Sequence, residues 1–128
     1  MIAHAKRDAQ LEAAEDTIQT WLVFRPMDEN AGLHDSAKAA QATVELFRDL
    51  LGLGLLEAGA YRGSGWLWGI PATEALGQVE EECRRLAAGT NEFGGCWFRA
   101  TPAGMAWVQR YYDGLALLSA AMVRPVGP

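Results

Sequence analysis

The sequence has little of what disulfide-bonded, metal-binding or membrane-spanning proteins require. Its two cysteines, Cys83 and Cys96, form no CxxC pair and lie far along the chain from either histidine. The apolar run at residues 115–123 is too short to cross a bilayer, and residues 1–10 contain no apolar stretch typical of a secretory signal. We therefore expect a cytoplasmic protein without metal or cofactor, in which both thiols are buried as small hydrophobic side chains.

Positive charge is also scarce. The 128 residues include 11 Lys and Arg against 16 Asp and Glu, which leaves a net charge of −5. This balance disfavours binding to a phosphate backbone, which depends on Lys and Arg, and it suits a partner protein with a basic surface. The length is typical of one domain, and a hydrophobic content of 50% is enough for a buried core. We therefore expect residues 1–128 to form a single domain.

No local pattern of a catalytic or nucleotide-binding site is present. The segment GAYRGSGWLWG, residues 59–69, has glycines spaced as in a phosphate loop. It lacks the lysine of such a loop and runs into WLWGIP rather than a helix, so this interpretation fails. The serines lack a Gly-x-Ser-x-Gly signature, and Glu80, Glu81 and Glu82 are expected to form a solvated helix face. We expect no enzymatic activity.

Helical periodicity and capping residues predict four helices. The first is expected at residues 2–20, and the second at about 36–51, where Asp35 or Ser36 can cap it. A third is expected at 72–88, and a fourth from residue 102, where Thr101 and Pro102 suit a first turn. The apolar stripes expected to be buried are Ala37, Ala40, Val44, Phe47 and Leu51 in the second helix, and Leu76, Val79, Cys83 and Leu86 in the third.

Two strands are expected, at residues 53–58 and 96–101. In the second, alternation places Cys96, Phe98 and Ala100 on one face and Trp97, Arg99 and Thr101 on the other. Residues 21–24 are expected to be a short strand or the last turn of the first helix, and 26–34 a loop. This order predicts an α+β domain in which two strands close on each other across an inserted helix.

Two groups of residues resemble the winged-helix family. Leu50, Leu51, Gly54, Leu55 and Leu56 match the passage from the recognition helix into a strand, and Phe98, Thr101, Pro102 and Gly104 match the end of the second wing strand. The resemblance implies a winged-helix-like fold of three main helices plus a β-hairpin, with a helix inserted into an enlarged wing at about 59–97. The chain departs from the family because residues 22–34 show no convincing helix before the recognition helix. A weaker similarity is to small bacterial immunity or antitoxin-like proteins.

The enlarged wing supplies the candidate partner-binding residues. They are Tyr61, Arg62, Trp66 and Trp68, flanked by Glu80 and Glu81. Because Trp, Tyr and Arg concentrate binding energy at interfaces, the leading hypothesis is a non-catalytic inhibitor or immunity-type protein that docks a basic protein surface. In a competing interpretation, the tryptophans form a small core under the inserted helix, against Leu76, Val79 and Cys83.

The alternative hypothesis is a winged-helix transcription regulator that binds DNA. Its expected contacts are Lys38, Gln41 and Arg48, with Arg62 in the wing, because Gln and Arg can bind adenine and guanine edges. A homodimer through the first and last helices would accompany this function, since operators are usually bound by two-fold dimers. A third hypothesis, a small-ligand sensor with a Trp-lined pocket, has less support.

Overall fold

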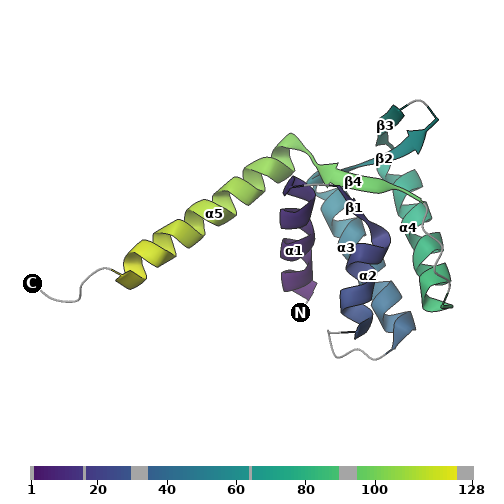
Figure 1. Cartoon of the computed structure of the whole chain (residues 1–128), viewed down its shortest axis with the longest axis horizontal. Coiled ribbons are helices and arrows are strands. Elements are labelled where there is room, and N and C mark those ends of the chain that lie inside the picture. Colours follow the sequence, from purple (N-terminus) through teal and green to yellow (C-terminus); the bar gives the residue numbers. More distant parts are fainter. Residues whose placement is uncertain (1, 16, 30–34, 64, 90–94, 124–128) are drawn as a thin grey trace, which may run out of the picture.

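The computed structural model describes residues 2–15, 17–29, 35–63, 65–89 and 95–123, and this part of the chain is an α+β protein (Figure 1). In chain order its elements are α1 (Ile2–Glu15), β1 (Ile18–Gln19), α2 (Thr20–Glu29), α3 (Ser36–Gly52), β2 (Leu56–Arg62), β3 (Gly65–Ile70), α4 (Ala72–Ala87), β4 (Trp97–Ala100) and α5 (Pro102–Val123). The strands form one antiparallel sheet in the order β1-β4-β2-β3. In Figure 1, α1 to α4 gather on one side of this sheet, whereas α5 runs away from them.

The N-terminal part differs most from the sequence prediction. The first helix ends at Glu15 rather than Thr20. The segment predicted as a short strand or the last turn of that helix, together with the start of the predicted loop, forms α2 up to Glu29. Residues 30–34 of the predicted loop lie outside the described residues. Val23 and Phe24 of α2 are buried in the core. Tertiary packing therefore outweighs the β propensity of the run WLVF, which was the basis of the strand alternative.

Helix α3 confirms the predicted helix and its N-cap but not its buried stripe. The Asp35 carboxylate accepts hydrogen bonds from the backbone N–H of Ala37 at 2.9 Å and of Lys38 at 3.3 Å. The buried residues are Ala39, Thr43, Leu46, Phe47 and Leu50, which share only Phe47 with the predicted stripe. The helix packs against α1, α2, α4 and β2. Because neighbours cover several sides of α3, the buried band is not the one that periodicity alone selects.

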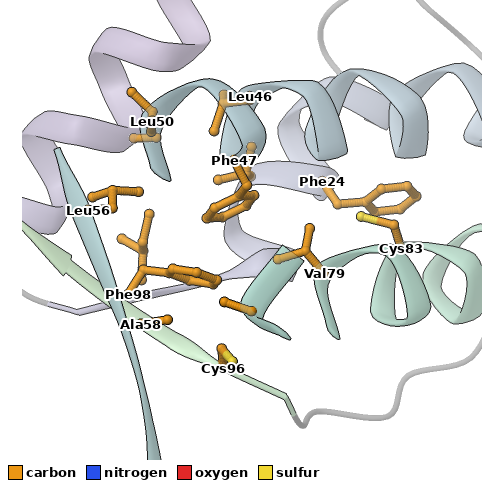
Figure 2. Close-up of a cluster of buried hydrophobic side chains, with 14 of the residues drawn as sticks. Phe24, Leu46, Phe47, Leu50, Leu56, Ala58, Val79, Cys83, Cys96 and Phe98 are labelled. Carbon is orange, nitrogen blue, oxygen red and sulfur yellow. The ribbon is translucent and has the colours of Figure 1, made fainter. Parts of the chain in front are cut away.

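The core fills the space between the sheet and the helices. Figure 2 shows side chains of α2, α3 and α4 pointing toward those of β2 and β4. The rings of Phe47 and Phe98 lie 4.5 Å apart between their centroids and join α3 to β4. Cys83 and Cys96 are both buried thiols, as predicted. Burial raises the pKa of the Cys83 thiol to about 12, so it stays protonated and unreactive at neutral pH.

A buried carboxyl group in α4 corrects another prediction. Glu82 was expected on a solvated face with Glu80 and Glu81, but it is only 2% exposed, beneath Gly95. Burial raises the pKa of Glu82, and the nearby Thr20 hydroxyl and Arg85 guanidinium, which favour the ionised form, do not offset it. Ionisation of Glu82 therefore destabilises the folded protein.

We expect Glu82→Gln to raise the free energy of unfolding by about 1 kcal/mol at pH 7, because the variant buries an amide instead of a carboxylate. A raised folded-state pKa means that the wild-type group favours folding below the ordinary carboxyl pKa and loses this contribution as pH rises through the raised value. The difference between variant and wild type should therefore shrink on acidification, as measured by urea unfolding from neutral pH to below pH 4.5.

Glu81→Gln provides the control for this experiment, because Glu81 is exposed and bonded to Arg84. Glu81→Gln should change the free energy of unfolding by less than about 0.5 kcal/mol. An equal effect of both substitutions at every pH would contradict the interpretation of Glu82.

Candidate functional site

The β2–β3 hairpin determines where the aromatic side chains of residues 59–69 lie. Trp66 pairs directly with Tyr61, and Trp68 pairs with Gly59. The pairing then shifts, because Ala58 pairs with Ile70, which leaves Gly69 as an extra residue with φ +89°. Such a bulge changes the direction of the side chains that follow it, and its positive φ suits glycine. Ile70 consequently packs against the core, although it lies only two positions from Trp68.

The opposite side of the sheet carries a set of aromatic rings. Leu56 and Ala58 of β2 and Phe98 of β4 are buried on the core side. Side chains alternate along a strand, so their neighbours Glu57, Trp97 and Arg99 occupy the outer side. The pairing places the other rings of the hairpin beside them. We call the outer-side residues Tyr61, Trp66, Trp68 and Trp97 the aromatic face.

Trp66 is the centre of the aromatic face. Its ring centroid lies 5.7 Å from that of Tyr61, 5.6 Å from that of Trp68 and 5.4 Å from that of Trp97. The Trp68 ring is stacked on Trp66, and the other two rings meet Trp66 edge to face, which are the favoured aromatic geometries. Tyr61 is 61% exposed and Trp66 46%, whereas Trp68 and Trp97 are half-buried. The cluster is thus ordered by its own contacts yet open to solvent.

Gly59 makes room for this arrangement. A Cβ atom at residue 59 would lie 2.5 Å from Cε3 of Trp68, which is closer than real Cβ atoms approach. The indole of Trp68 therefore lies directly on the bare backbone of the neighbouring strand. Gly59, one of the glycines spaced as in a phosphate loop, thus provides a platform for a ring.

An arginine covers the outer surface of the Trp68 ring. The Cζ atom of Arg99 lies 4.0 Å from the ring centroid, and its Nε donates a hydrogen bond to the Glu57 carboxylate. A guanidinium over an indole face is a favourable cation–π pair, and the carboxylate balances its charge. This contact shows that the Trp68 ring of the aromatic face accepts a planar cation.

The structure brings together only part of the predicted partner-binding set. Tyr61, Trp66 and Trp68 share the aromatic face, whereas the side chain of Arg62 lies outside the described residues. The prediction that Glu80 and Glu81 flank the rings is wrong. They belong to α4, which packs into the core on the other side of the sheet. There, Oε1 of Glu80 lies 3.8 Å from Nη2 of Arg48, and Glu81 forms an ion pair with Arg84. The competing small core is wrong as well, because Trp66 and Trp68 face away from that helix.

The sequence prediction omitted Glu57, Trp97 and Arg99 from the site. The alternation in CWFRAT already placed Trp97 and Arg99 on one face, so this signal was available. That the face was the outer one, and that Glu57 lies opposite Arg99, required the strand pairing.

The candidate DNA contacts Lys38, Gln41 and Arg48 are all exposed on α3. Arg48 forms an ion pair with Glu80 of α4. The acidic helix α4 therefore lies beside the surface that would contact the DNA phosphates. Another exposed region is a shallow hollow along α4, lined by Glu74, Gly77, Gln78, Glu81, Arg85 and Gly95. None of these lining residues is a tryptophan, unlike the predicted small-ligand pocket.

Comparison with known proteins gave no relative: no protein-family model, curated protein or solved structure matches this chain. In the part of the chain that the structure describes, no helix has the length and apolar character needed to cross a membrane. Across the same residues, no three His, Cys, Asp or Glu side chains gather as a metal site would need.

Proposed function

We propose that this protein is a non-catalytic interaction module of the cytoplasm, a small acidic inhibitor or immunity-type protein that docks a partner protein through the aromatic face. The observation that carries this proposal is Trp66, which is 46% exposed and contacts the rings of Tyr61, Trp68 and Trp97. Clustered rings on a protein surface mark interaction sites more often than isolated ones do. Trp and Tyr also lead the residues in which interfaces concentrate their binding energy.

The charge of the chain supports a basic partner. With a net charge of −5, the protein attracts a positive surface over a distance and raises the association rate. Beside the aromatic face, the Glu57 carboxylate compensates the charge of Arg99, so this arginine repels an approaching cation less. The rings would then supply the short-range affinity, and the acidic surface would attract the basic partner during encounter.

We expect Trp66→Ala to weaken partner binding at least about tenfold while leaving the fold intact, because the ring contributes to the face but not to the core. Affinity capture from cells of the natural host identifies the partner, and titration of the purified partner against wild type and variant measures the affinity.

Tyr112→Ala is the matched control for this experiment. Tyr112 of α5 is also an aromatic residue exposed to 46%, but it lies outside the aromatic face. If both variants lose the partner equally, or if neither does, the assignment to the aromatic face is wrong.

We also propose that the chain has a winged-helix fold with an enlarged wing. The support is the order α1-β1-α2-α3-β2 followed by β4, which pairs with β1 and β2, while β3 and α4 form an insertion. Helix α2 supplies the helix before α3 that the sequence interpretation lacked. Because of this arrangement, a DNA-binding regulator that forms a homodimer through α1 and α5 is the second candidate function.

A binding assay with pooled genomic DNA at low salt separates the two candidates, because electrostatic affinity is greatest there. An interaction module with Glu80 beside Arg48 should not be retained. Retention that Lys38→Glu and Gln41→Ala both abolish would instead favour the regulator.

A further inference from the structure

Strand β3 is the unprotected edge of the sheet. It stands last in the strand order, and among the described residues no strand pairs with its outer side. Figure 1 shows the hairpin at the outer end of the sheet. Natural edge strands are usually protected by charged side chains, proline or bulges. The sequence of β3, GWLWGI, contains no charged residue, and its bulge at Gly69 comes only near the end of the strand.

Both faces of this edge offer apolar contacts. Trp66 points to the outer side of the sheet, and Leu67, which is 55% exposed, alternates to the other side. Side chains of paired strands lie about 5 Å apart, so a strand added to β3 would contact Trp66 on one face and Leu67 on the other. The backbone groups of the edge would supply hydrogen bonds, as in β-strand addition by peptide-binding domains.

The molecule already contains the side-chain contact that such a strand could repeat. Arg99 projects from β4 over the ring of Trp68, with its charge compensated by Glu57. The exposed part of Trp66 offers an equivalent ring to a neighbouring cation. The net charge of −5 also favours a basic segment over an acidic one.

Taking the proposed function as its basis, we infer that β3 binds an extended segment of the partner protein as a fifth strand, with a Lys or Arg side chain of that segment over Trp66. The bound segment pairs its backbone with residues 65–68 before the bulge. Specificity then comes from alternate side chains, a cation on the outer side and an apolar residue against Leu67.

The test uses labelled synthetic peptides of about seven residues that alternate Val and Thr, with Arg, Glu or Leu at the central position. Fluorescence anisotropy against the full chain should show binding of the Arg peptide and at least about tenfold weaker binding of the Glu peptide. An Arg peptide with N-methylated backbone amides, which cannot donate hydrogen bonds, should lose binding to a similar extent.

Two protein variants locate the site. Leu67→Lys places a charge on the edge while leaving the rings of the aromatic face unchanged. It should lower the affinity for the Arg peptide at least about tenfold. Leu53→Lys is the matched control, because Leu53 is an exposed leucine in the connection between α3 and β2, and it should have no effect. Circular dichroism confirms that both variants remain folded.

The outcomes separate this inference from the proposed function. Strand addition is overturned if no peptide binds the wild type, if Arg and Glu peptides bind equally, or if Leu67→Lys binds as the wild type does. It is also overturned if a second copy of the chain occupies the edge, seen as a dimer that Leu67→Lys dissociates. Partner capture that is lost with Trp66→Ala but kept with Leu67→Lys would leave the proposed function standing and remove the strand addition.

Discussion

Replacing Phe98 with alanine is expected to lower the free energy of unfolding by about 4 kcal/mol. The Phe98 side chain is completely buried, and its ring lies 4.5 Å from that of Phe47. Residue 98 also occupies the middle of the sheet, where it pairs with Ile18 on one side and Ala58 on the other. Truncation would leave a cavity between α3 and the sheet that neither element can close alone. Urea unfolding followed by far-ultraviolet circular dichroism measures the loss.

Phe98→Leu is the control for this prediction. Leucine keeps most of the apolar volume, so its cost should stay near or below 1.5 kcal/mol. Equal losses for the two variants would show that the aromatic contact with Phe47, rather than filled volume, holds this site together. The effect should extend to the aromatic face, because the same strand that buries Phe98 carries Trp97 and Arg99 on its outer side.

The second large effect is expected for Gly104→Ala, with a loss of about 3 kcal/mol. A Cβ atom at this position would overlap the backbone carbonyl oxygen of Leu55 and lie 2.5 Å from Nε2 of Gln10. That carbonyl accepts hydrogen bonds from the Thr101 N–H and from the Gln10 side chain, both at 3.1 Å. The added methyl group would therefore displace a backbone junction to which α1, the residue before β2 and the start of α5 all contribute.

Gly114→Ala provides a comparison within the same helix. Nothing lies within 4 Å of a Cβ atom built there, so the change should stabilise the protein by up to about 1 kcal/mol through helix propensity. Opposite signs for the two glycines, measured by thermal and urea unfolding, would confirm that close approach is the reason for Gly104. Destabilisation of similar size at both would attribute the effect to the helix in general.

Local signals in the sequence identified several elements correctly. Asp35 begins α3 as its N-cap, and the N–H of Gly104 donates to Oγ1 of Thr101 at 3.0 Å, so the predicted start of α5 is also confirmed. The alternation around Phe98 predicted β4 and its buried face. These features depend on neighbouring residues alone, because a cap or an alternating strand is specified within a few positions.

Other features depended on contacts between distant segments. Helix α2 forms from a β-prone run because Val23 and Phe24 find burial in the core. Glu82 is buried, while the adjacent Glu81 is not, because of where α4 meets Thr20 and Gly95. A local pattern cannot contain this information, since the neighbours responsible lie far away in the chain.

For the candidate site, the sequence by itself determined the inventory: an acidic chain with a glycine-rich segment that carries Tyr61, Trp66 and Trp68. Only the tertiary structure decided which side of the sheet these rings occupy. The bulge at Gly69 turns Ile70 toward the core and leaves Trp68 on the outer side, over the bare backbone of Gly59. Strand pairing then added Trp97 and Arg99 and separated Glu80 and Glu81 from the rings. The physical reason is that the side chains a face presents depend on register between strands, which residues far apart in the chain set together.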